Sequence, residues 1–285
     1  MFLRSDFANP MNAPKCFSLL PLLLVTFFIN SAKAEDVAKA DELPKYQTGY
    51  SATMKLGTDI YTALKEKYHS HIAVQPISLE TDVTPSIKPA EYPDEKNPIQ
   101  MVFISVGFLD LINHVAHAKA IDKIEAGYFE KYLLSLGQEK GEMSLKELPR
   151  ISDKSFWTDD IMNEQLSNFN QMTGMLVAMN LSHFYLGHFK KYGDKLDEEA
   201  GKKGEIVNNL MTSSEWDDSL KCGAAHALDC GFGVDGIKAL YDCINKMPKR
   251  PIWTQYFLPE KANVSKVKSQ LEKYEKDYFQ GKLTY

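Results

Sequence analysis

The chain has 285 residues, of which 44% are hydrophobic, 11% aromatic and 25% charged. This is the composition of a globular protein with enough apolar residues to bury a core. The formal net charge of −5 provides no electrostatic basis for binding nucleic acid, so that class of partner is excluded.

The first 34 residues have the pattern of a secretory signal peptide. Arg4 and Lys15 precede an apolar run over residues 19–29, and Ala32, Lys33 and Ala34 form a small-x-small exit. The run is too short for a transmembrane helix. We therefore expect cleavage after Ala34 and a periplasmic or secreted protein that does not span a membrane. Met1 and Met11 are alternative starts, and the second gives a signal of more usual length.

Residues 35–98 are expected to form a loose N-terminal arm. Leu56, Ile60 and Leu64 recur every four residues, which predicts a helix over residues 53–67. The second half of the arm is rich in proline and has little periodicity, which predicts an extended loop with one strand over residues 71–76.

The main domain is expected to cover residues 99–285 and to begin with its best strand. Residues 99–106 are apolar and rich in β-forming residues, and they lie between Pro98 and Gly107. The pattern then predicts a helix over residues 108–120, another over 126–136, and a polar loop over 137–160.

The longest predicted helix, residues 163–192, organises the rest of the chain. It has no proline, and six residues recur at alternating spacings of three and four, which places them on one face that must be buried. These residues are Phe169, Met172, Leu176, Met179, His183 and Leu186.

The C-terminal third is predicted to be mostly helical. Residues 194–209 are charged and irregular, Thr212 and Glu215 provide a capped helix start, and further helices are expected over residues 235–247 and 264–279. Residues 252–259 form an aromatic loop. With one good strand among many helices, the mature chain is expected to be a single helix-dominated α+β domain.

Three cysteines remain after the predicted cleavage, and they cluster within about twenty residues of one another. They are Cys222, Cys230 and Cys243. In an oxidising compartment two of them could form a disulfide and leave one thiol, whereas packed helices would hold all three as small buried residues. Both alternatives stay open, because the spacing does not select a pairing.

The residues around His183 resemble the active-site helix of gluzincin zinc metallopeptidases, in particular the family of the CAAX prenyl protease and its periplasmic relatives. That family carries H-E-x-x-H on a helix, followed by G-H. His183 corresponds to the second histidine, and Gly187 and His188 correspond to the trailing G-H. The resemblance covers residues 99–247 and implies a zincin-like metalloprotease domain, with a small sheet and a long central active-site helix.

Two departures from the motif change the expected function. Met179 replaces the first histidine, and Asn180 replaces the glutamate that acts as general base. A thioether is a poor zinc ligand and a neutral amide cannot accept a proton. Losing the base alone removes ~10²–10⁴-fold of rate. We therefore expect no catalytic residue and no cofactor, and a pseudo-protease that binds protein or peptide partners.

Two alternatives remain. A rearranged metal site would use His183, His226, Glu215 and Asp218, with Met179 and His188 around it, and would make the chain an active zinc-dependent hydrolase. The other alternative is a non-enzymatic structural protein of the envelope, with a fold unrelated to zincins. In that case Met179 fills core volume and His183 is a buried, hydrogen-bonded histidine.

Overall fold

The computed structural model describes residues 46, 49–69, 72–92, 98–137, 145–196 and 204–285. All of them belong to one compact unit, Leu43–Tyr285. The predicted signal peptide, residues 1–34, lies outside the described residues. No helix in the described ranges is long and apolar enough to cross a membrane.

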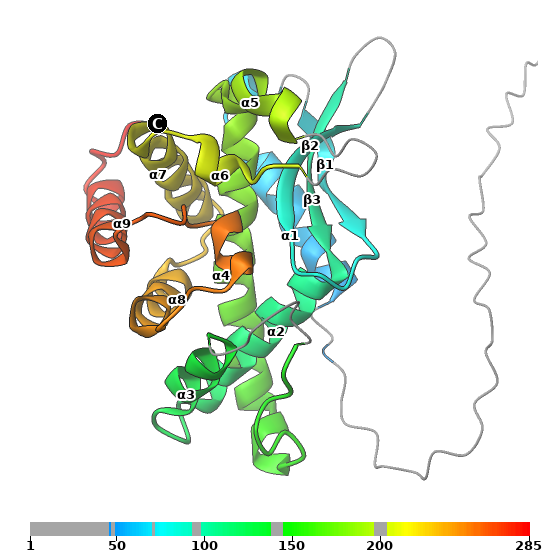
Figure 1. Ribbon diagram of the computed structural model, residues 1–285, viewed down its shortest axis with the longest axis vertical. Coiled ribbons are helices and arrows are strands. Elements are labelled where there is room, and N and C mark those ends of the chain that lie inside the picture. Colours follow the sequence, from blue (N-terminus) through cyan, green and yellow to red (C-terminus); the bar gives the residue numbers. More distant parts are fainter. Residues whose placement is uncertain (1–45, 47–48, 70–71, 93–97, 138–144, 197–203) are drawn as a thin grey trace, which may run out of the picture. The chain divides into compact units, whose positions relative to one another are not determined.

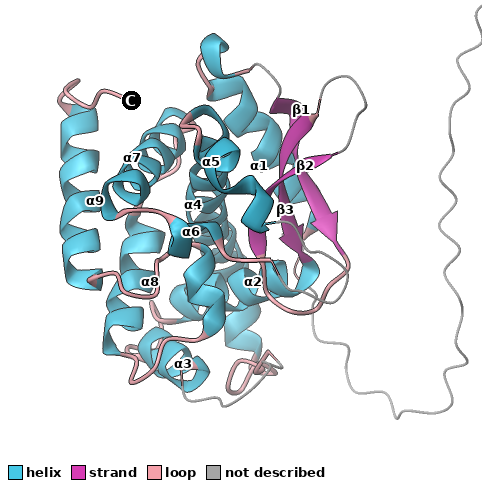
Figure 2. Cartoon of the chain, turned by 45° about the horizontal axis from the view of Figure 1, so that its top comes forward, coloured by secondary structure: helices cyan, strands magenta, loops and turns pink. Residues whose placement is uncertain are grey.

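A small mixed sheet lies at one side of this unit (Figure 2). Its strands are β1 (Ile72–Glu80), β2 (Ile87–Tyr92) and β3 (Ile99–Ser105), in the order β1-β3-β2. β1 is parallel to β3, with Ile77 opposite Val102, and β2 is antiparallel to β3, with Ala90 opposite Met101. The central strand β3 lies within residues 99–106, the segment with the clearest strand pattern in the sequence.

The helices make up most of the structure. They are α1 (Tyr50–Ala63), α2 (Val106–Ile121), α3 (Tyr128–Leu136), α4 (Asp159–Tyr185), α5 (His188–Leu196), α6 (Val207–Leu210), α7 (Ser213–Asp229), α8 (Asp235–Lys246) and α9 (Val264–Phe279). Short 3-10 turns cover Glu66–Tyr68, Lys154–Trp157 and Ile252–Tyr256. The helix-dominated α+β class with a small sheet is therefore confirmed.

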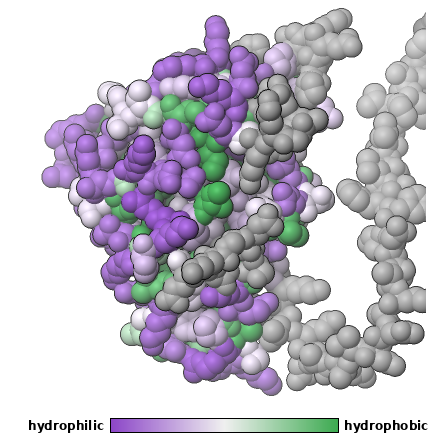
Figure 3. Space-filling view, viewed as in Figure 1, coloured by the Kyte–Doolittle hydropathy of each residue, from purple (hydrophilic) through white to green (hydrophobic). Residues whose placement is uncertain are grey.

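Helix α4 runs through the middle of this unit (Figure 1). It packs against the sheet, α1 and α2, and also against α7 and α8. Every residue from 172 to 184 is buried, on all sides of the helix. The apolar face read from the sequence is thus only part of what α4 buries. In the view of Figure 3, hydrophilic residues cover most of the face over α7, α8 and α9, and hydrophobic residues show only in small areas.

The boundary expected between an arm ending at residue 98 and a domain starting at residue 99 does not divide the described chain. β1 and β2 both pair with β3, and α1 packs on β1. The prolines of residues 68–98 predicted a loop, but Pro89 lies inside β2, at the edge of the sheet, where a missing N–H is tolerated.

The helix predicted over residues 163–192 is also wrong in its extent. It begins earlier, at Asp159, because the Thr158 hydroxyl accepts a hydrogen bond from the Ile161 N–H and caps the helix. It ends at Tyr185, because Gly187 has a φ of 78° and breaks the helical path. A separate helix, α5, then begins at His188.

Candidate functional site

The break after α4 brings His183 and His188 together. On a regular helix, residues five apart point about 140° away from each other. With Gly187 in the left-handed region between them, the two Nδ1 atoms lie 3.2 Å apart. The bend that a direct contact between these histidines requires is therefore present.

Helix α7 supplies a third polar group to the same place. The Oγ atom of Ser219 lies 3.2 Å from the Nδ1 atom of His183 and 3.2 Å from that of His188. Helix α7 approaches α4 closely because Gly223 has no side chain. A Cβ atom there would lie 2.3 Å from the Cγ atom of Met179. We call His183, His188 and Ser219 the histidine cluster.

Burial keeps the two histidines of this cluster uncharged. His183 is 1% exposed, and desolvation, followed by the neighbouring His188, lowers its pKa to about 3. Burial also lowers the pKa of His188, although the carboxylates of Glu215 and Asp218 act in the opposite direction. Both imidazoles are therefore neutral at pH 7, and each Nδ1 is either a donor or an acceptor.

Met179 and Asn180 occupy core positions on α4. Met179 is 2% exposed and fills the space beside Gly223. The side-chain amide of Asn180 donates to the Leu176 carbonyl at 2.8 Å, and its Oδ1 atom has no partner among the described residues. Neither side chain carries a charge or an ionisable proton, so the two positions offer neither a metal-ligand pair nor a general base.

Glu215, the residue expected to provide a carboxylate ligand, is engaged at the start of α7. It forms a capping box with Thr212 and also contacts Lys191 Nζ at 2.7 Å and Tyr192 Oη at 3.0 Å. The hydrogen bond from Lys191 is the main reason that the pKa of Glu215 is lowered to about 2. Asp218 lies 3.4 Å from Lys221 in a partly exposed ion pair.

His226 belongs to a different cluster. Its Nε2 atom lies 2.7 Å from the Tyr185 hydroxyl, and its Nδ1 atom lies 3.9 Å from the Asp229 carboxylate. Tyr278 donates to the same carboxylate at 2.8 Å, and the Tyr285 ring lies edge-on to His226. Burial lowers the pKa of His226 to about 4.

The rearranged ligand set is therefore not brought together. His183 and His226 lie in separate clusters, and the described residues contain no group of three or more His, Cys, Asp or Glu that could hold a metal ion. Glu215 and Asp218 have basic partners instead. The described residues therefore do not provide the three-residue ligand set that the resemblance implies, although His183 and His188 are close enough to share an ion.

The three cysteines in the described residues, Cys222, Cys230 and Cys243, are free thiols. Cys222 and Cys243 are buried and Cys230 is partly buried, and burial raises the pKa of all three. None of these three forms a disulfide, and the alternative in which they are small buried residues holds for Cys222 and Cys243, whereas Cys230 is partly exposed.

A narrow groove runs along β2, and no sequence motif indicated it. It has a volume of about 160 Å³. On one side lie Ile87, Lys88, Pro89, Ala90 and Glu91 of β2. Facing them are Phe189 and Leu196 of α5, Ile206, Val207 and Tyr256. The sequence alone does not reveal this groove, because it forms only where α5 lies beside the sheet in the folded chain.

Comparisons with protein-family models, with curated proteins and with solved structures find no match for this chain. Its class is thus defined by its own structure, as a helix-dominated α+β protein with a buried histidine cluster at the end of its central helix.

Proposed function

We propose that this chain is an exported, metallopeptidase-like protein that has lost catalytic activity and binds an extended segment of a protein or peptide. The observation that carries the proposal is the groove lined by β2 and α5, because Met179 and Asn180, both neutral and buried in the core, leave α4 without a catalytic base. The signal-peptide pattern of residues 1–34 supports export.

The edge of the sheet supports binding of an extended peptide. β2 pairs with β3 along one edge, and among the described residues no strand pairs with its other edge. Such an edge presents backbone donors and acceptors that an added strand can use. Phe189 and Val207 line the opposite side of the groove and offer apolar surface to alternate side chains of that strand.

The chemistry at the end of α4 supports binding without hydrolysis. Peptide hydrolysis by the H-E-x-x-H mechanism needs a base to deprotonate water. Asn180 cannot serve, and the carboxylate of Glu215 is occupied by Lys191, Tyr192 and Thr212. The proposed function is therefore recognition of the partner chain.

The test is to incubate the purified protein with unfolded, fluorescein-labelled casein. We expect a rise in fluorescence anisotropy, which reports binding, and intact casein on a gel after prolonged incubation. Release of labelled fragments, removed by a chelator, would contradict the proposal. Absence of any anisotropy change would also contradict it.

The second candidate is an active metal hydrolase whose ligands include His183. The observation that favours it is the 3.2 Å separation of the His183 and His188 Nδ1 atoms. Two ligands of a tetrahedral zinc with Zn–N ~2.0 Å lie about 3.3 Å apart. Metal analysis separates the candidates: zinc bound one-to-one and lost in His183→Ala supports the hydrolase and contradicts the pseudo-protease.

A further inference from the structure

Two histidines of α2 and one tryptophan surround the side chain of Tyr46, which belongs to the chain ahead of α1. The centroid of the Tyr46 ring lies 5.7 Å from that of His114 and 5.5 Å from that of His117. The ring of Trp157, at the end of the 3-10 turn, lies 5.6 Å away on a third side. We call His114, His117 and Trp157 the ring cradle. Its contact with Tyr46 joins segments that are distant in the sequence, since Tyr46 and His117 are 71 residues apart.

Partners other than Tyr46 hold the three rings of the cradle in place. The His117 Nε2 atom donates to the Phe156 carbonyl at 2.6 Å, and the Trp157 Nε1 atom donates to the Ile151 carbonyl at 2.6 Å. The His114 Nδ1 atom has two polar neighbours of its own at 3.3 Å. The cradle is therefore preorganised, and a preorganised site costs less conformational entropy to fill.

Hydrogen bonding makes the cradle selective for a phenol. A carbonyl oxygen can only accept, so the Phe156 carbonyl fixes the proton of His117 on Nε2. Burial lowers the pKa of His117, so the ring is neutral at pH 7 and its Nδ1 atom is an acceptor. The Tyr46 hydroxyl lies 2.9 Å from this Nδ1 atom and donates to it. The occupant of the cradle must therefore combine an aromatic ring with a hydroxyl donor at its far end.

The side chain is the attachment of Tyr46 to the rest of the described structure. No backbone hydrogen bond among the described residues involves Tyr46, and its hydrogen bond to a described residue is the one to His117. Helix α1 begins only at Tyr50. An attachment made by one side chain opens at a lower free energy than the core of the fold.

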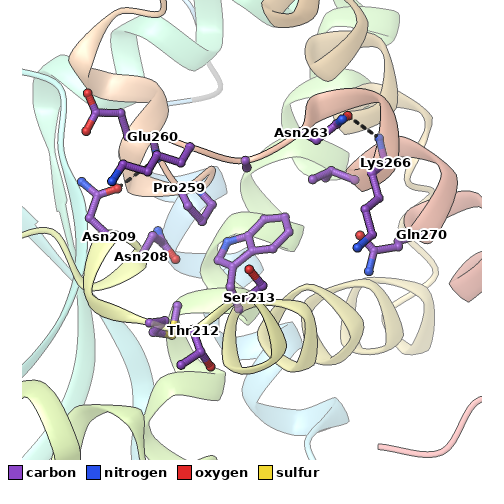
Figure 4. Close-up of a pocket in the computed structure, with 14 residues that line it drawn as sticks. Asn208, Asn209, Thr212, Ser213, Pro259, Glu260, Asn263, Lys266 and Gln270 are labelled. Atoms are coloured by element: carbon purple, nitrogen blue, oxygen red, sulfur yellow. Dashed lines mark hydrogen bonds between the residues drawn. The ribbon is translucent and has the colours of Figure 1, made fainter.

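We propose that the ring cradle is a tyrosine-binding site, and that Tyr46 fills it as a releasable anchor for the chain ahead of α1. The proposal does not rest on the proposed function, because the cradle shares no residue with the groove along β2 or with the histidine cluster. It is also separate from a larger cavity of about 590 Å³ between the starts of α7 and α9, where Ser213 and Lys266 lie on facing helices (Figure 4).

Trypsin cleavage of the purified protein after Lys45 tests the anchor. The bond that is cut joins Lys45 to Tyr46, so a bound Tyr46 side chain keeps this bond out of the protease. The cleavage rate then follows the fraction of molecules in which the anchor is released. Mass spectrometry of the products measures the rate, and a synthetic peptide of residues 40–52 gives the rate for the freely accessible bond. We expect the bond in the protein to be cut at least about tenfold more slowly than in the peptide.

Tyr46→Phe keeps the ring and removes the hydroxyl donor. It should be cut about two- to tenfold faster than the wild-type protein, because one hydrogen bond of the bound state is lost. Tyr50→Phe removes the hydroxyl of an exposed tyrosine in the first turn of α1 and is the matched control, which should be cut at the wild-type rate. Peptides with the same substitutions correct for the preference of trypsin itself.

A second measurement tests the cradle without the anchor. Tyr46→Ala empties the cradle, and p-cresol, which is the side chain of tyrosine as a free molecule, should raise the melting temperature of this variant more than that of the wild-type protein. Toluene, which has the ring without the hydroxyl, should raise it less. The proposal is overturned if the bond is cut equally fast in protein and peptide, or if Tyr46→Phe and Tyr50→Phe are cut equally. It is also overturned if p-cresol stabilises Tyr46→Ala no more than the wild-type protein, or no more than toluene does.

Discussion

The Nδ1 atom of His183 lies 3.2 Å from the Nδ1 atom of His188, because α4 ends between them and the chain turns at Gly187. Both rings are buried, and the Ser219 hydroxyl is within reach of each. The pair therefore forms a neutral polar centre inside an otherwise apolar part of the fold, and its protonation is coupled to folding.

Acid should destabilise the protein through His183. Its pKa is lowered from 6.5 to about 3 in the folded state, so the unfolded chain binds a proton that the folded chain does not. The stabilisation is complete above pH 6.5 and is lost as the pH falls toward about 3. Within this window His183 contributes a slope of about 1.4 kcal/mol per pH unit to the free energy of unfolding.

Urea denaturation across this pH window measures the slope. His183→Gln should reduce the slope by about 1.4 kcal/mol per pH unit, which is the contribution of one proton. Equal slopes in wild type and His183→Gln would mean that His183 is not protected from protonation.

Gly187→Ala should destabilise the protein by ~1–2 kcal/mol, the cost of a left-handed conformation for a residue with a side chain. The added Cβ meets no atom within 4 Å, so the cost is one of backbone conformation. Gly193→Ala, inside α5, should instead stabilise by ~0.5–1 kcal/mol. Thermal or urea unfolding of both variants checks this, and effects of the same sign would argue against the turn at Gly187.

Gly223→Ala should destabilise by ~1–3 kcal/mol, because the new Cβ would crowd the Met179 side chain and the α4 backbone. Combining it with Met179→Ala should cost less than the sum of the two single changes, since the crowding is partly relieved. Gly233→Ala is the control, because its Cβ would meet only Gln171 at an ordinary contact distance. If the destabilising effects of the two single changes simply add in the double variant, the Met179 side chain does not pack against α7.

Phe189→Ala should weaken binding of unfolded casein about tenfold, if the groove along β2 is where the chain binds. Phe279→Ala removes an exposed phenylalanine at the end of α9, outside the groove, and should bind as wild type. Fluorescence anisotropy of labelled casein measures both affinities. If the two variants lose affinity equally, the groove is not the binding surface.

Local signals made several elements predictable. The bounds of α9, Val264–Phe279, agree with the predicted helix because Asn263 caps it and its apolar residues keep helical spacing. Helix α7 follows the capping box of Thr212 and Glu215. In both cases the information lies within a few residues of the helix start.

Elements that depend on distant partners were not predictable in the same way. β2 contains Pro89, which argues against a strand until the neighbouring β3 shows that this is an edge. The end of α4 had a usable signal, since Gly187 precedes a histidine and a basic run, but a single glycine inside a helical pattern does not by itself end a helix.

The sites depended still more on tertiary structure. His183 was predictable as a buried histidine, but its neighbours His188 and Ser219 are brought to it by the turn and by the approach of α7 at Gly223. The groove along β2 joins Pro89 to Phe189 and Leu196, about a hundred residues further along the chain, and no sequence pattern marks it.

The burial of α4 on every side from residue 172 to 184 has a consequence for how the protein opens. Because this stretch packs against the sheet, α2, α7 and α8, no single neighbour can leave and expose its backbone completely. Its amide hydrogens should therefore exchange with solvent only when the whole unit unfolds. Hydrogen exchange at these amides would report the global free energy of unfolding, whereas amides of α5 and α9 would report local fraying.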